Sequence, residues 1–465
     1  MNNLVEFLQN EIVYYIISGV LALMVMFGIY LMSKVEKARL GNIISAVSVL
    51  LAIIITLVRY DILSVWALYI YLVIGAVIGI VMTVKLKMIE TPQIVALLNG
   101  FGGLASMIVG SYALFEIGAD DSVFANVTAI IAMLVGMITF VGSLIAALKL
   151  ARKINQKPVS LKHHTLILTV LLIVMALLII LTPILSIPAW VVMVIGVIVS
   201  AVFGLLFTLK IGGADMPIAI SLLNSLSGVA GAISGLAIGD VLLVSISGIV
   251  GASGLLLTQI MCKAMNRKLI DILLGKTSTK TVVQEAVKIV EKPQTEKTNP
   301  YEVIKKAKNV IIVPGYGMAI AQAQYVVKDL ADFLKKNGST VKFAIHPVAG
   351  RMPGHMNVLL AEVDVDYDDL YEMDSVNPEF KTADATIVIG ANDVLNPSAR
   401  IKEGTPIYGM PILNVDQSNE VFIFNYDLKP GYSGVNNSLY ERPGIHFFLG
   451  NAKDTLSAFL LELKK

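Results

Sequence analysis

The sequence predicts an α-helical bundle that crosses a membrane nine times, followed by an α/β domain with a parallel sheet. Three observations lead to this fold class. The chain of 465 residues is 56% hydrophobic, with a mean hydropathy of +0.77, which is too apolar for a soluble protein. Residues 1–262 hold 12 Lys/Arg and 10 Asp/Glu, which is only 22 of the 70 charged residues. Beyond them, short apolar runs alternate with helical patterns, which is typical of a parallel sheet.

Nine apolar segments are long enough to span a bilayer, since a span needs about 20 mostly apolar residues. They cover residues 11–32, 43–58, 62–84, 93–115, 123–148, 165–186, 188–209, 216–238 and 241–262. The second segment is short, and Pro183 and Pro188 blur the boundary between the sixth and the seventh. The first segment starts without a basic region, so no cleavable signal peptide is expected.

The charges of the loops predict the orientation of the spans. Loops on one side carry fourteen basic residues, whereas those on the other side carry Arg59 alone, with acids such as Glu116 and Asp240. By the positive-inside rule, the N-terminus faces out and the C-terminal domain lies in the cytoplasm. The fourteen residues are Lys34, Lys37, Arg39, Lys85, Lys87, Lys149, Arg152, Lys153, Lys157, Lys162, Lys210, Lys263, Arg267 and Lys268.

An internal repeat with an offset of 125 residues links the fourth and eighth spans. TVKLKMIETPQIVALLNGFGGLA (83–105) aligns with TLKIGGADMPIAISLLNSLSGVA (208–230), so that Asn99 matches Asn224 and Glu90 matches Asp215. An even number of spans separates the copies, which therefore share one orientation. An Asn in lipid is costly and usually faces the bundle interior, where it serves either packing or a polar conduction path. No span has a clear titratable residue at mid-depth, so a carboxylate relay is not expected.

Residues 263–300 are polar and predict a linker between a transmembrane domain (1–262) and a soluble domain (301–465). The acidic run 364–374 is expected to be a solvated face. Alternating elements predict a parallel sheet with helices on both faces. The expected strands are 309–313, 340–345, 384–389, 407–414, 421–425 and 445–449, and the expected helices are 318–336, 354–362, 375–382 and 453–463.

The first strand of the soluble domain ends at a glycine turn. Gly315 and Gly317 form a G-x-G ahead of a helical pattern, where backbone N–H groups can approach a pyrophosphate. The motif alone is weak because Ile320 holds the third glycine position. His346, rather than the acid that normally grips the ribose of NAD, ends the second strand. This strand, glycine turn, helix and second strand are compatible with NADP binding, with an unusual binding mode, or with a turn that binds no ligand.

Further glycine-rich turns follow the other strands, at 348–355, 390–393, 431–434 and 450–452. Ligands of open α/β sheets bind at the carboxyl ends of strands, so these turns predict a Rossmann-like dinucleotide site. Arg351 is either a phosphate clamp or an exposed loop arginine. The single Cys262 excludes an internal disulfide and a cysteine metal cluster, and no histidine spacing indicates a metal site. No basic stripe suggests binding to nucleic acid.

The chain contains the stretches VPGYGMAIAQAQY, HPVAGRMPGHMNVLLAE, VIGANDVLNP and IMCKAMNRKL, with GADMP and LLNS in the membrane part. They closely resemble the β subunit of proton-translocating NAD(P) transhydrogenase, and the resemblance covers essentially the whole chain. It implies that this chain binds NADP(H), that a partner α subunit of one or two chains binds NAD(H), and that hydride passes directly from NADH to NADP⁺. Inward proton translocation would drive the transfer, in a dimer of αβ units surrounded by lipid in a bacterial inner membrane.

The resemblance also implies the roles of particular residues. Asp393 looks like the acid that couples the nucleotide state to the proton state. The polar membrane positions tied to proton passage are matched by Asn99, Asn224, Asp215 and Ser253. The nucleotide is expected to bind in reversed orientation, and its implied site comprises Gly315, Tyr316, Gly317, Val348, Ala349, Gly350, Arg351, Met352, Pro353, Gly390, Ala391, Asn392, Asp393, Val394, Gly409, Met410, Asn425, Tyr426, Asp427, Lys429, Gly431, Tyr432, Asn451 and Ala452.

Two positions depart from the family pattern. Many members carry a Lys-Arg-Ser cluster that holds the 2′-phosphate of NADP, where this chain has Asn425, Tyr426 and Asp427. Asp427 repels a phosphate, and the neighbouring Lys429 is the group that can compensate. Some members have His where this chain has Asn99, so a water path replaces a histidine proton carrier.

Two other functions remain as alternatives. A nucleotide-gated ion channel or transporter would use the soluble domain only to sense nucleotide, and it would show flux without hydride transfer. A dehydrogenase with a membrane anchor is disfavoured because nine spans exceed what an anchor needs.

Overall fold

The computed structural model describes residues 10–34, 37–62, 65–85, 90–116, 122–155, 158–185, 187–212, 215–264, 268–269, 299–350 and 354–465. These residues fall into two compact units. The first, named the membrane unit for the spans predicted above, comprises the described parts of residues 1–212 and 218–258. The second, named the nucleotide unit for the ligand predicted above, comprises those of 213–217 and 259–465. Most of the expected linker 263–300 lies outside the described residues.

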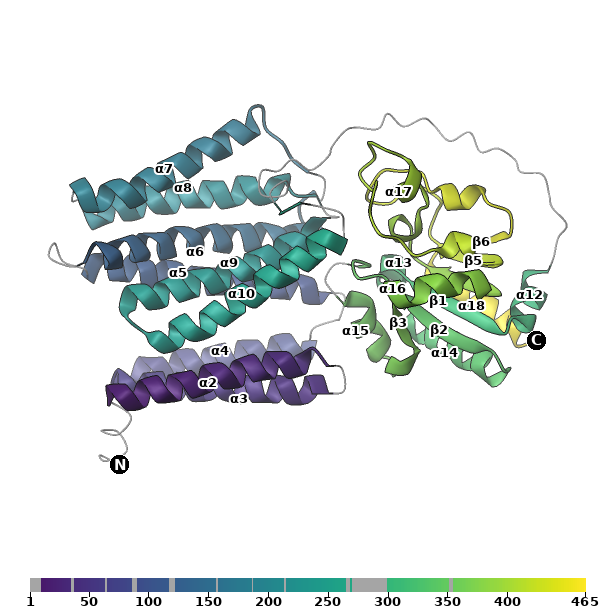
Figure 1. Ribbon diagram of the computed structural model, residues 1–465, viewed down its shortest axis with the longest axis horizontal. Helices are drawn as coiled ribbons and strands as arrows, with labels where there is room; N and C mark the ends of the chain where they lie inside the picture. The colour runs from purple at the N-terminus through teal and green to yellow at the C-terminus, as the bar shows by residue number, and fades with distance from the viewer. Residues whose placement is uncertain are drawn as a thin grey trace. The chain divides into compact units, whose positions relative to one another are not determined.

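The membrane unit is a bundle of long apolar helices (Figure 1). Within the described ranges, nine helices are long and apolar enough to cross a membrane, which confirms the predicted bundle. The second span is not short, since its helix runs over 22 residues. The helices are α2 (Glu11–Met32), α3 (Ala38–Arg59), α4 (Trp66–Lys85), α5 (Thr91–Glu116), α6 (Val123–Leu150), α7 (His164–Leu185), α8 (Ala189–Lys210), α9 (Met216–Ile238) and α10 (Val241–Ala264).

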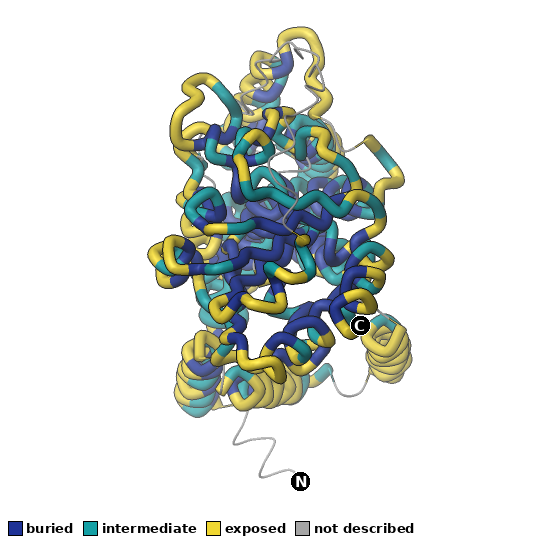
Figure 2. Tube along the Cα trace, turned by 90° about the vertical axis from the view of Figure 1, so that its right-hand side faces the viewer, coloured by how far each residue is buried: buried dark blue, intermediate teal, exposed yellow. Residues whose placement is uncertain are grey.

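Glycines let the helices of this bundle approach at backbone distance. A Cβ added to Gly103 of α5 would lie 2.7 Å from the carbonyl oxygen of Gly136 on α6, and one added to Gly110 would lie 2.7 Å from that of Ala129. Small residues at helix contacts are typical of association in lipid, where close van der Waals packing replaces the hydrophobic effect. Figure 2 shows exposed residues winding around the long helices, and many of them are large apolar side chains suited to contact with lipid.

The nucleotide unit contains, within the described residues, a six-stranded sheet with order β3-β2-β1-β4-β5-β6. Every neighbouring pair is parallel, which confirms the predicted α/β domain. The order reverses between β1 and β4, and this switch point is where such sheets bind ligands. The strands are β1 (Asn309–Pro314), β2 (Thr340–Ile345), β3 (Leu370–Glu372), β4 (Ala385–Ile389), β5 (Glu420–Asn425) and β6 (Ile445–Leu449).

Short helices and turns cover the two faces of this sheet. On one face, Phe459 packs with its ring centroid 5.3 Å from Phe424 and 4.9 Å from Phe448. On the other face, Phe380 and Leu395 join Val313 and Val388 in one buried cluster. The helices are α12 (Pro300–Lys306), α13 (Tyr316–Ala321), α14 (Gln324–Lys336), α15 (His355–Ala361), α16 (Met373–Val376), α17 (Ser398–Ile401) and α18 (Ala452–Leu463), with 3-10 turns at Tyr367–Asp369, Asn377–Thr382, Asp393–Leu395, Val415–Gln417 and Ser438–Glu441.

The strand predicted at 407–414 is wrong. Ile407 and Ile412 are buried, but they pack in a small separate cluster with Ala399 and Val435. Gly409 has a φ of +75°, and its N–H donates to the carbonyl of Ala399 at 2.8 Å instead of joining the sheet. Burial produced an apolar run of strand length, but a left-handed glycine and a proline prevented an extended ladder.

Three other predictions need correction. The acidic run 364–374 is not only a solvated face, since β3 (370–372) adds an edge strand to β2. The helix expected at 318–336 is two helices, because Gln322 takes the left-handed conformation with a φ of +51°. The helix expected at 375–382 is largely the 3-10 turn Asn377–Thr382, where Pro378 lacks the N–H that an α-helix requires.

Candidate functional site

The glycine turns after β1 and β4 pack directly on each other. The N–H of Gly317 donates to the carbonyl of Gly390 at 2.8 Å, and a Cβ added to Gly317 would lie 2.6 Å from the Cα of Gly390. A Cβ on Gly315 would collide with Gly390 and Ala391. These glycines are therefore needed for close backbone packing at the switch point, and Gly390, with a φ of +67°, also requires the left-handed conformation.

Aromatic rings from three different segments gather beside this turn. The ring of Tyr316 lies 6.3 Å from that of Tyr432 and 6.4 Å from that of His355, measured between centroids. Gly350 packs its backbone on the imidazole of His355 and has a φ of +105°. Ala349 is buried, whereas Arg351, Met352 and Pro353 lie outside the described residues. The structure thus brings together the predicted residues 316, 350 and 432, and the remaining three cannot be placed.

Asp393 joins two of the predicted loops. Its carboxylate accepts hydrogen bonds from the backbone N–H of Ser433 at 3.0 Å and from its hydroxyl at 2.6 Å. Gly431 packs on the same carboxyl group, and Asn392 donates to the carbonyl of Lys429 at 2.9 Å. Burial raises the pKa of Asp393, while the hydrogen bonds from Ser433 act in the opposite direction. A titratable group therefore holds the loop at 429–433 to the turn after β4.

The residues after β5 point in different directions. Asn425 is 6% exposed and donates at 3.0 Å both to the carbonyl of Ala391 and to the hydroxyl of Tyr440. The neighbouring Tyr426 is 80% exposed. Asp427 accepts from the N–H of Lys429 at 3.1 Å, and the Lys429 ammonium lies 3.5 Å from its carboxylate. Asn425 therefore also acts inside the fold, whereas Tyr426 and Lys429 are exposed and Asp427 is half-buried.

Two further pairs of predicted site residues remain. Gly409 and Met410 lie in the segment before β5, and Asn451 and Ala452 follow β6. Met410 is half-buried and packs against the cluster of Ile407 and Ile412, whereas Gly409 is exposed. The Asn451 side chain caps α18 by accepting from the N–H of Lys453 at 2.9 Å, and Ala452 is buried. Asn451 follows β6, so it stands at the same carboxyl edge as the turns after β1, β4 and β5.

In the membrane unit, the repeated helices α5 and α9 are neighbours. A Cβ added to Gly102 of α5 would lie 2.6 Å from the hydroxyl of Ser227, its repeat equivalent on α9. Asn99 is 9% exposed, and its side-chain N–H₂ lacks a hydrogen-bond partner among the described residues, whereas Asn224 is half-buried. Asp215 is 4% exposed at the start of α9.

Helix α10 completes this arrangement. The hydroxyl of Ser225 on α9 donates to the carbonyl of Gly251 at 2.7 Å, and the backbone of Gly228 packs on Gly251. Ser253 is half-buried and donates to the carbonyl of Val250 at 3.0 Å. The structure therefore places Asn224 and Ser253 on one tightly packed helix pair, next to the helix that carries Asn99.

Comparison with known proteins identifies the family. Residues 13–462 match the family model described as NAD(P) transhydrogenase beta subunit. The chain is 40% identical over 473 residues to the NAD(P) transhydrogenase subunit beta of Rhodospirillum rubrum and to that of its strain ATCC 11170, with 94% of this chain and 96% of each relative covered. The chain belongs to the NAD(P) transhydrogenase beta subunit family. The predicted resemblance, and the class of enzyme that it implies, are confirmed.

The sequence reasoning missed one residue beside Asn99 in this family member. Ser143 of α6 is fully buried and packs against Gly100, the residue after Asn99. Its hydroxyl has no hydrogen-bond partner within the described ranges, and neither has that of Thr208, which faces Gly142 of α6. Serine is frequent in membrane helices, so only its position opposite Gly100 distinguishes it.

His346 was noted above only because it occupies the position of the acid that normally binds the ribose. In the structure of this transhydrogenase family member it joins two loops. It is 2% exposed, its Nε2 lies 2.9 Å from the carbonyl oxygen of Pro411, and its Nδ1 accepts from the N–H of Val348 at 3.3 Å. Burial lowers the pKa of His346 to about 4, so the imidazole is neutral at pH 7. The neutral ring fastens the loop after β2 to the segment that carries Gly409 and Met410.

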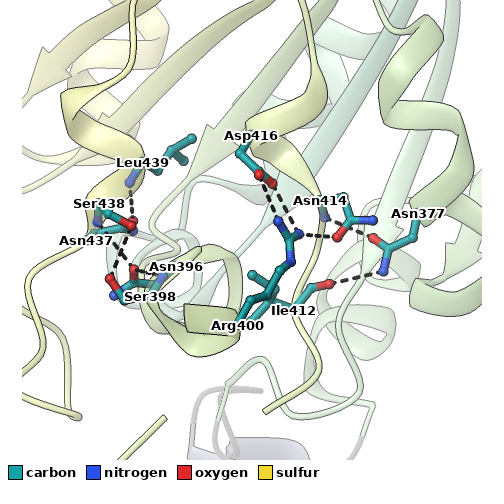
Figure 3. A network of polar contacts seen from close by, with 10 residues as sticks. All are labelled: Asn377, Asn396, Ser398, Arg400, Ile412, Asn414, Asp416, Asn437, Ser438 and Leu439. Atoms are coloured by element: carbon teal, nitrogen blue, oxygen red, sulfur yellow. Dashed lines mark hydrogen bonds and ion pairs between the residues drawn. The ribbon is translucent and has the colours of Figure 1, made fainter. Parts of the chain in front are cut away.

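A polar network supports that segment (Figure 3). Arg400 of α17 forms two hydrogen bonds with Asp416, at 2.8 and 3.2 Å, and a third with Asn414. Asn377 accepts from the N–H of Asn414 at 2.9 Å and donates to the carbonyl of Ile412 at 3.0 Å. The Asn377 side chain thus binds two peptide groups that a strand ladder would otherwise pair, and the Arg400 bonds join side chains around it. In sequence these residues are scattered singly, so no motif signals them.

Proposed function

We propose that this chain couples inward proton translocation to direct hydride transfer from NADH, bound on a partner subunit, to NADP⁺ bound on its nucleotide unit. The observation that carries the proposal is the convergence of the turns after β1, β4, β5 and β6 on one carboxyl edge, in a chain of this family that also has nine membrane helices in its described residues. The membrane potential contributes about 2.3 kcal/mol per charge per 100 mV, which biases a transfer between cofactors of similar potential.

The residues at the carboxyl edge fit a dinucleotide. The turn at Gly390 is left-handed and faces the N-terminus of α13, Tyr426 and Tyr432 present exposed rings, and Lys429 supplies an exposed cation. Together with the predicted residues around them, these groups would bind the pyrophosphate, the bases and the 2′-phosphate. NADH on the partner would supply the hydride and the NADP⁺ bound here would accept it, while the protein orients the nicotinamide and excludes water.

The proton path is proposed to pass the polar interior of α5, α6, α9 and α10. Asn99, Ser143 and Asn224 would order water there, since amides and hydroxyls neither gain nor lose charge at neutral pH. Asp215 and Ser253 belong to the same proposed path. Asp393 would couple its own protonation to nucleotide binding. Its ionisation changes the two hydrogen bonds that hold the loop at 429–433, and that loop is part of the proposed nucleotide site.

The membership of a beta-subunit family implies an alpha subunit as partner. We propose that this partner, of one or two chains, carries the NAD(H) site, and that two such units form a dimer. The proposed domains are 1–262 for proton translocation, 263–300 as a linker and 301–465 for NADP(H). We place the complex in a bacterial inner membrane, with the N-terminus outside and the nucleotide unit in the cytoplasm.

Calorimetry on the 290–465 fragment with NADPH and with NADH tests the nucleotide assignment. A clear preference for NADPH supports the proposal and indicates that Lys429 or a neighbour replaces the missing cluster. A preference for NADH would contradict the assignment of NADP(H) to this chain. Ion flux that responds to nucleotide in membranes lacking hydride transfer would favour the alternative of a nucleotide-gated channel.

A further inference from the structure

A buried carboxyl group that the proposed proton path does not yet include lies at the turn between α9 and α10. Asp240 is 3% exposed, although its neighbours Gly239 and Val241 are both exposed. The proposed orientation places this turn on the outer side of the membrane. A buried carboxylate is costly unless other groups stabilise it, so its neighbours indicate how it is held there.

Helices α2 and α10 supply hydrogen bonds to this carboxyl group. The hydroxyl of Tyr14 on α2 donates to Oδ1 of Asp240 at 2.9 Å, and the backbone N–H of Leu243 donates to the same oxygen at 2.9 Å. The bond from Leu243 caps the N-terminus of α10. Tyr14 is 2% exposed and belongs to the same apolar cluster as Leu242, so the two helices are closely packed at this point.

The end of α3 adds a phenol and a cation. Tyr60 follows α3 and faces the same carboxyl group, and its pKa is raised by burial and by the charge of Asp240. The guanidinium of Arg59 lies 5.6 Å from the centroid of the Tyr14 ring and 3.6 Å from the carboxylate of Glu11. The Glu11 side chain is 71% exposed, so Asp240 is the buried carboxylate of this group of residues.

Helices α9 and α10 connect this carboxyl group to residues of the proposed proton path. Asp240 lies at the turn between them, and Asn224 lies further along α9. Between these two residues, Ser234 of α9 is 1% exposed, and the hydroxyl of Ser247 on α10 would lie 2.7 Å from a Cβ added to Gly231. Hydroxyl groups thus stand along this helix pair, and a hydroxyl can both donate and accept a hydrogen bond.

We propose that Asp240 takes up the proton on the outer side of the membrane, before the proton passes along α9 and α10. The inference rests on the proposed function and orientation. The ionised carboxylate binds a proton from outer water at one oxygen and releases it to water between the helices, so no other bond forms or breaks. The bonds from Tyr14 and Leu243 favour the ionised form, which allows the proton to leave again.

Asp240→Asn separates proton uptake from the structural bonds, because Asn keeps an oxygen that can accept from Tyr14 and is as good an N-cap as Asp. The full complex with the alpha subunit would be reconstituted in liposomes with its nucleotide units outside. The formation of NADPH from NADH and NADP⁺ would be followed as the lumenal pH is lowered at constant external pH. We expect the variant to lose its response to lumenal pH and its rate to fall by about 100-fold.

Glu116→Gln is the matched control, since it neutralises an exposed carboxylate at the end of α5 on the same proposed side. This control should behave as the unmodified complex does. An Asp240→Asn variant with the unmodified rate and pH response would overturn the proposal, because only the cap and the Tyr14 bond would then matter. An unmodified complex that transfers hydride without responding to lumenal pH would instead refute the proposed function.

Tyr14→Phe gives a second measure that leaves the carboxyl group in place. Phe keeps the aromatic ring beside Arg59 but removes one hydrogen bond to the ionised carboxylate. The lumenal pH at half-maximal rate should therefore rise by about one unit. An unchanged midpoint in this variant would contradict the assignment of proton uptake to Asp240.

Discussion

The membrane unit and the nucleotide unit satisfy their polar side chains in opposite ways. In the membrane helices many hydroxyls donate to a carbonyl of the preceding turn, and the residues that do so include Ser48, Thr83, Ser106, Thr128, Thr139, Thr169, Thr182, Ser200, Ser234, Ser245 and Thr258. In the nucleotide unit the polar side chains join segments far apart in sequence. His346 and Pro411, for example, are 65 residues apart, and Asp393 and Ser433 are 40 apart.

The difference follows from the solvent. A bilayer offers no water to a polar group, so a helix satisfies its hydroxyls locally, and these bonds reveal little about function. The informative groups are found among the exceptions, which include the Asn99 amide and the Ser143 and Thr208 hydroxyls, each without a hydrogen-bond partner in the part of the chain that is described. In the nucleotide unit the long-range bonds of His346, Asp393 and Asn425 fix loops, so bonded groups are the informative ones.

The largest expected effect is on stability and comes from His346, which forms a long-range hydrogen bond with Pro411 in the nucleotide unit. Its pKa is lowered to about 4, so the unfolded state binds the proton more readily than the folded state between pH 6.5 and 4. The free energy of unfolding therefore falls by on the order of 3 kcal/mol as the pH drops through that window, and is unaffected by this group above it. Thermal unfolding of the chain and of His346→Gln over that range measures the effect. The variant should show a flatter pH dependence, and parallel curves would contradict the assignment.

Asn99→Leu tests a buried amide of the membrane unit that lacks a hydrogen-bond partner among the described residues. Proton-coupled turnover should fall by about 100-fold, roughly 2.7 kcal/mol, because an apolar side chain cannot order water in the bundle interior. Ser106→Ala is the control, since Ser106 lies on the same helix but is satisfied by the carbonyl of Gly102. Rates measured in membrane vesicles should distinguish the two. Equal rates for both variants would remove Asn99 from the proton path.

Asn425→Leu tests a long-range bond near the nucleotide. The substitution leaves the buried carbonyl of Ala391 without its donor, which should cost about 2 kcal/mol of stability. Ser457→Ala removes a local bond to the carbonyl of Lys453 on α18 and should change stability by less than about 0.5 kcal/mol. Denaturant titration compares the variants, and similar midpoints would show that the long-range bond is no more important than the local one.

The smallest expected effect is on specificity. Asp427→Arg replaces an exposed acid, paired with Lys429, by a cation, and should tighten NADPH binding about fivefold, roughly 1 kcal/mol. The affinity for NADH serves as the control and should not change. An unchanged affinity for NADPH would move the 2′-phosphate away from this residue.

The sequence predicted the elements whose pattern has one physical meaning. Apolar runs of span length, as in α2 and α10, predict membrane helices, and β1, β4 and β5 are mostly apolar and buried because both of their faces are covered. The sequence-based predictions were wrong where the burial of a segment does not determine whether its backbone is a strand. Ile407 and Ile412 are buried but their segment is held by side chains, and β3 lies in an acidic run and is only half-buried but still pairs with β2.

The candidate site was foreseeable in part. The glycines at 315, 317 and 390 follow strands, so their convergence is a consequence of a parallel sheet. The direction of a side chain does not follow from the sheet. The Asn425 side chain bonds to Ala391 inside the fold, while Tyr426 is exposed. Partners such as Ser433 for Asp393 and Gly100 for Ser143 are set by loop closure and helix packing over long sequence separations, which local patterns do not encode.

The most direct test of the account is proton movement measured together with hydride transfer. The complex with the alpha subunit would be reconstituted in liposomes with its nucleotide units outside, and NADPH and NAD⁺ would be added while a dye reports the lumenal pH. Acidification of the lumen in step with hydride transfer, abolished by Asn99→Leu, is the predicted result. Hydride transfer without a change in lumenal pH, or a pH change triggered by nucleotide without hydride transfer, would contradict the account.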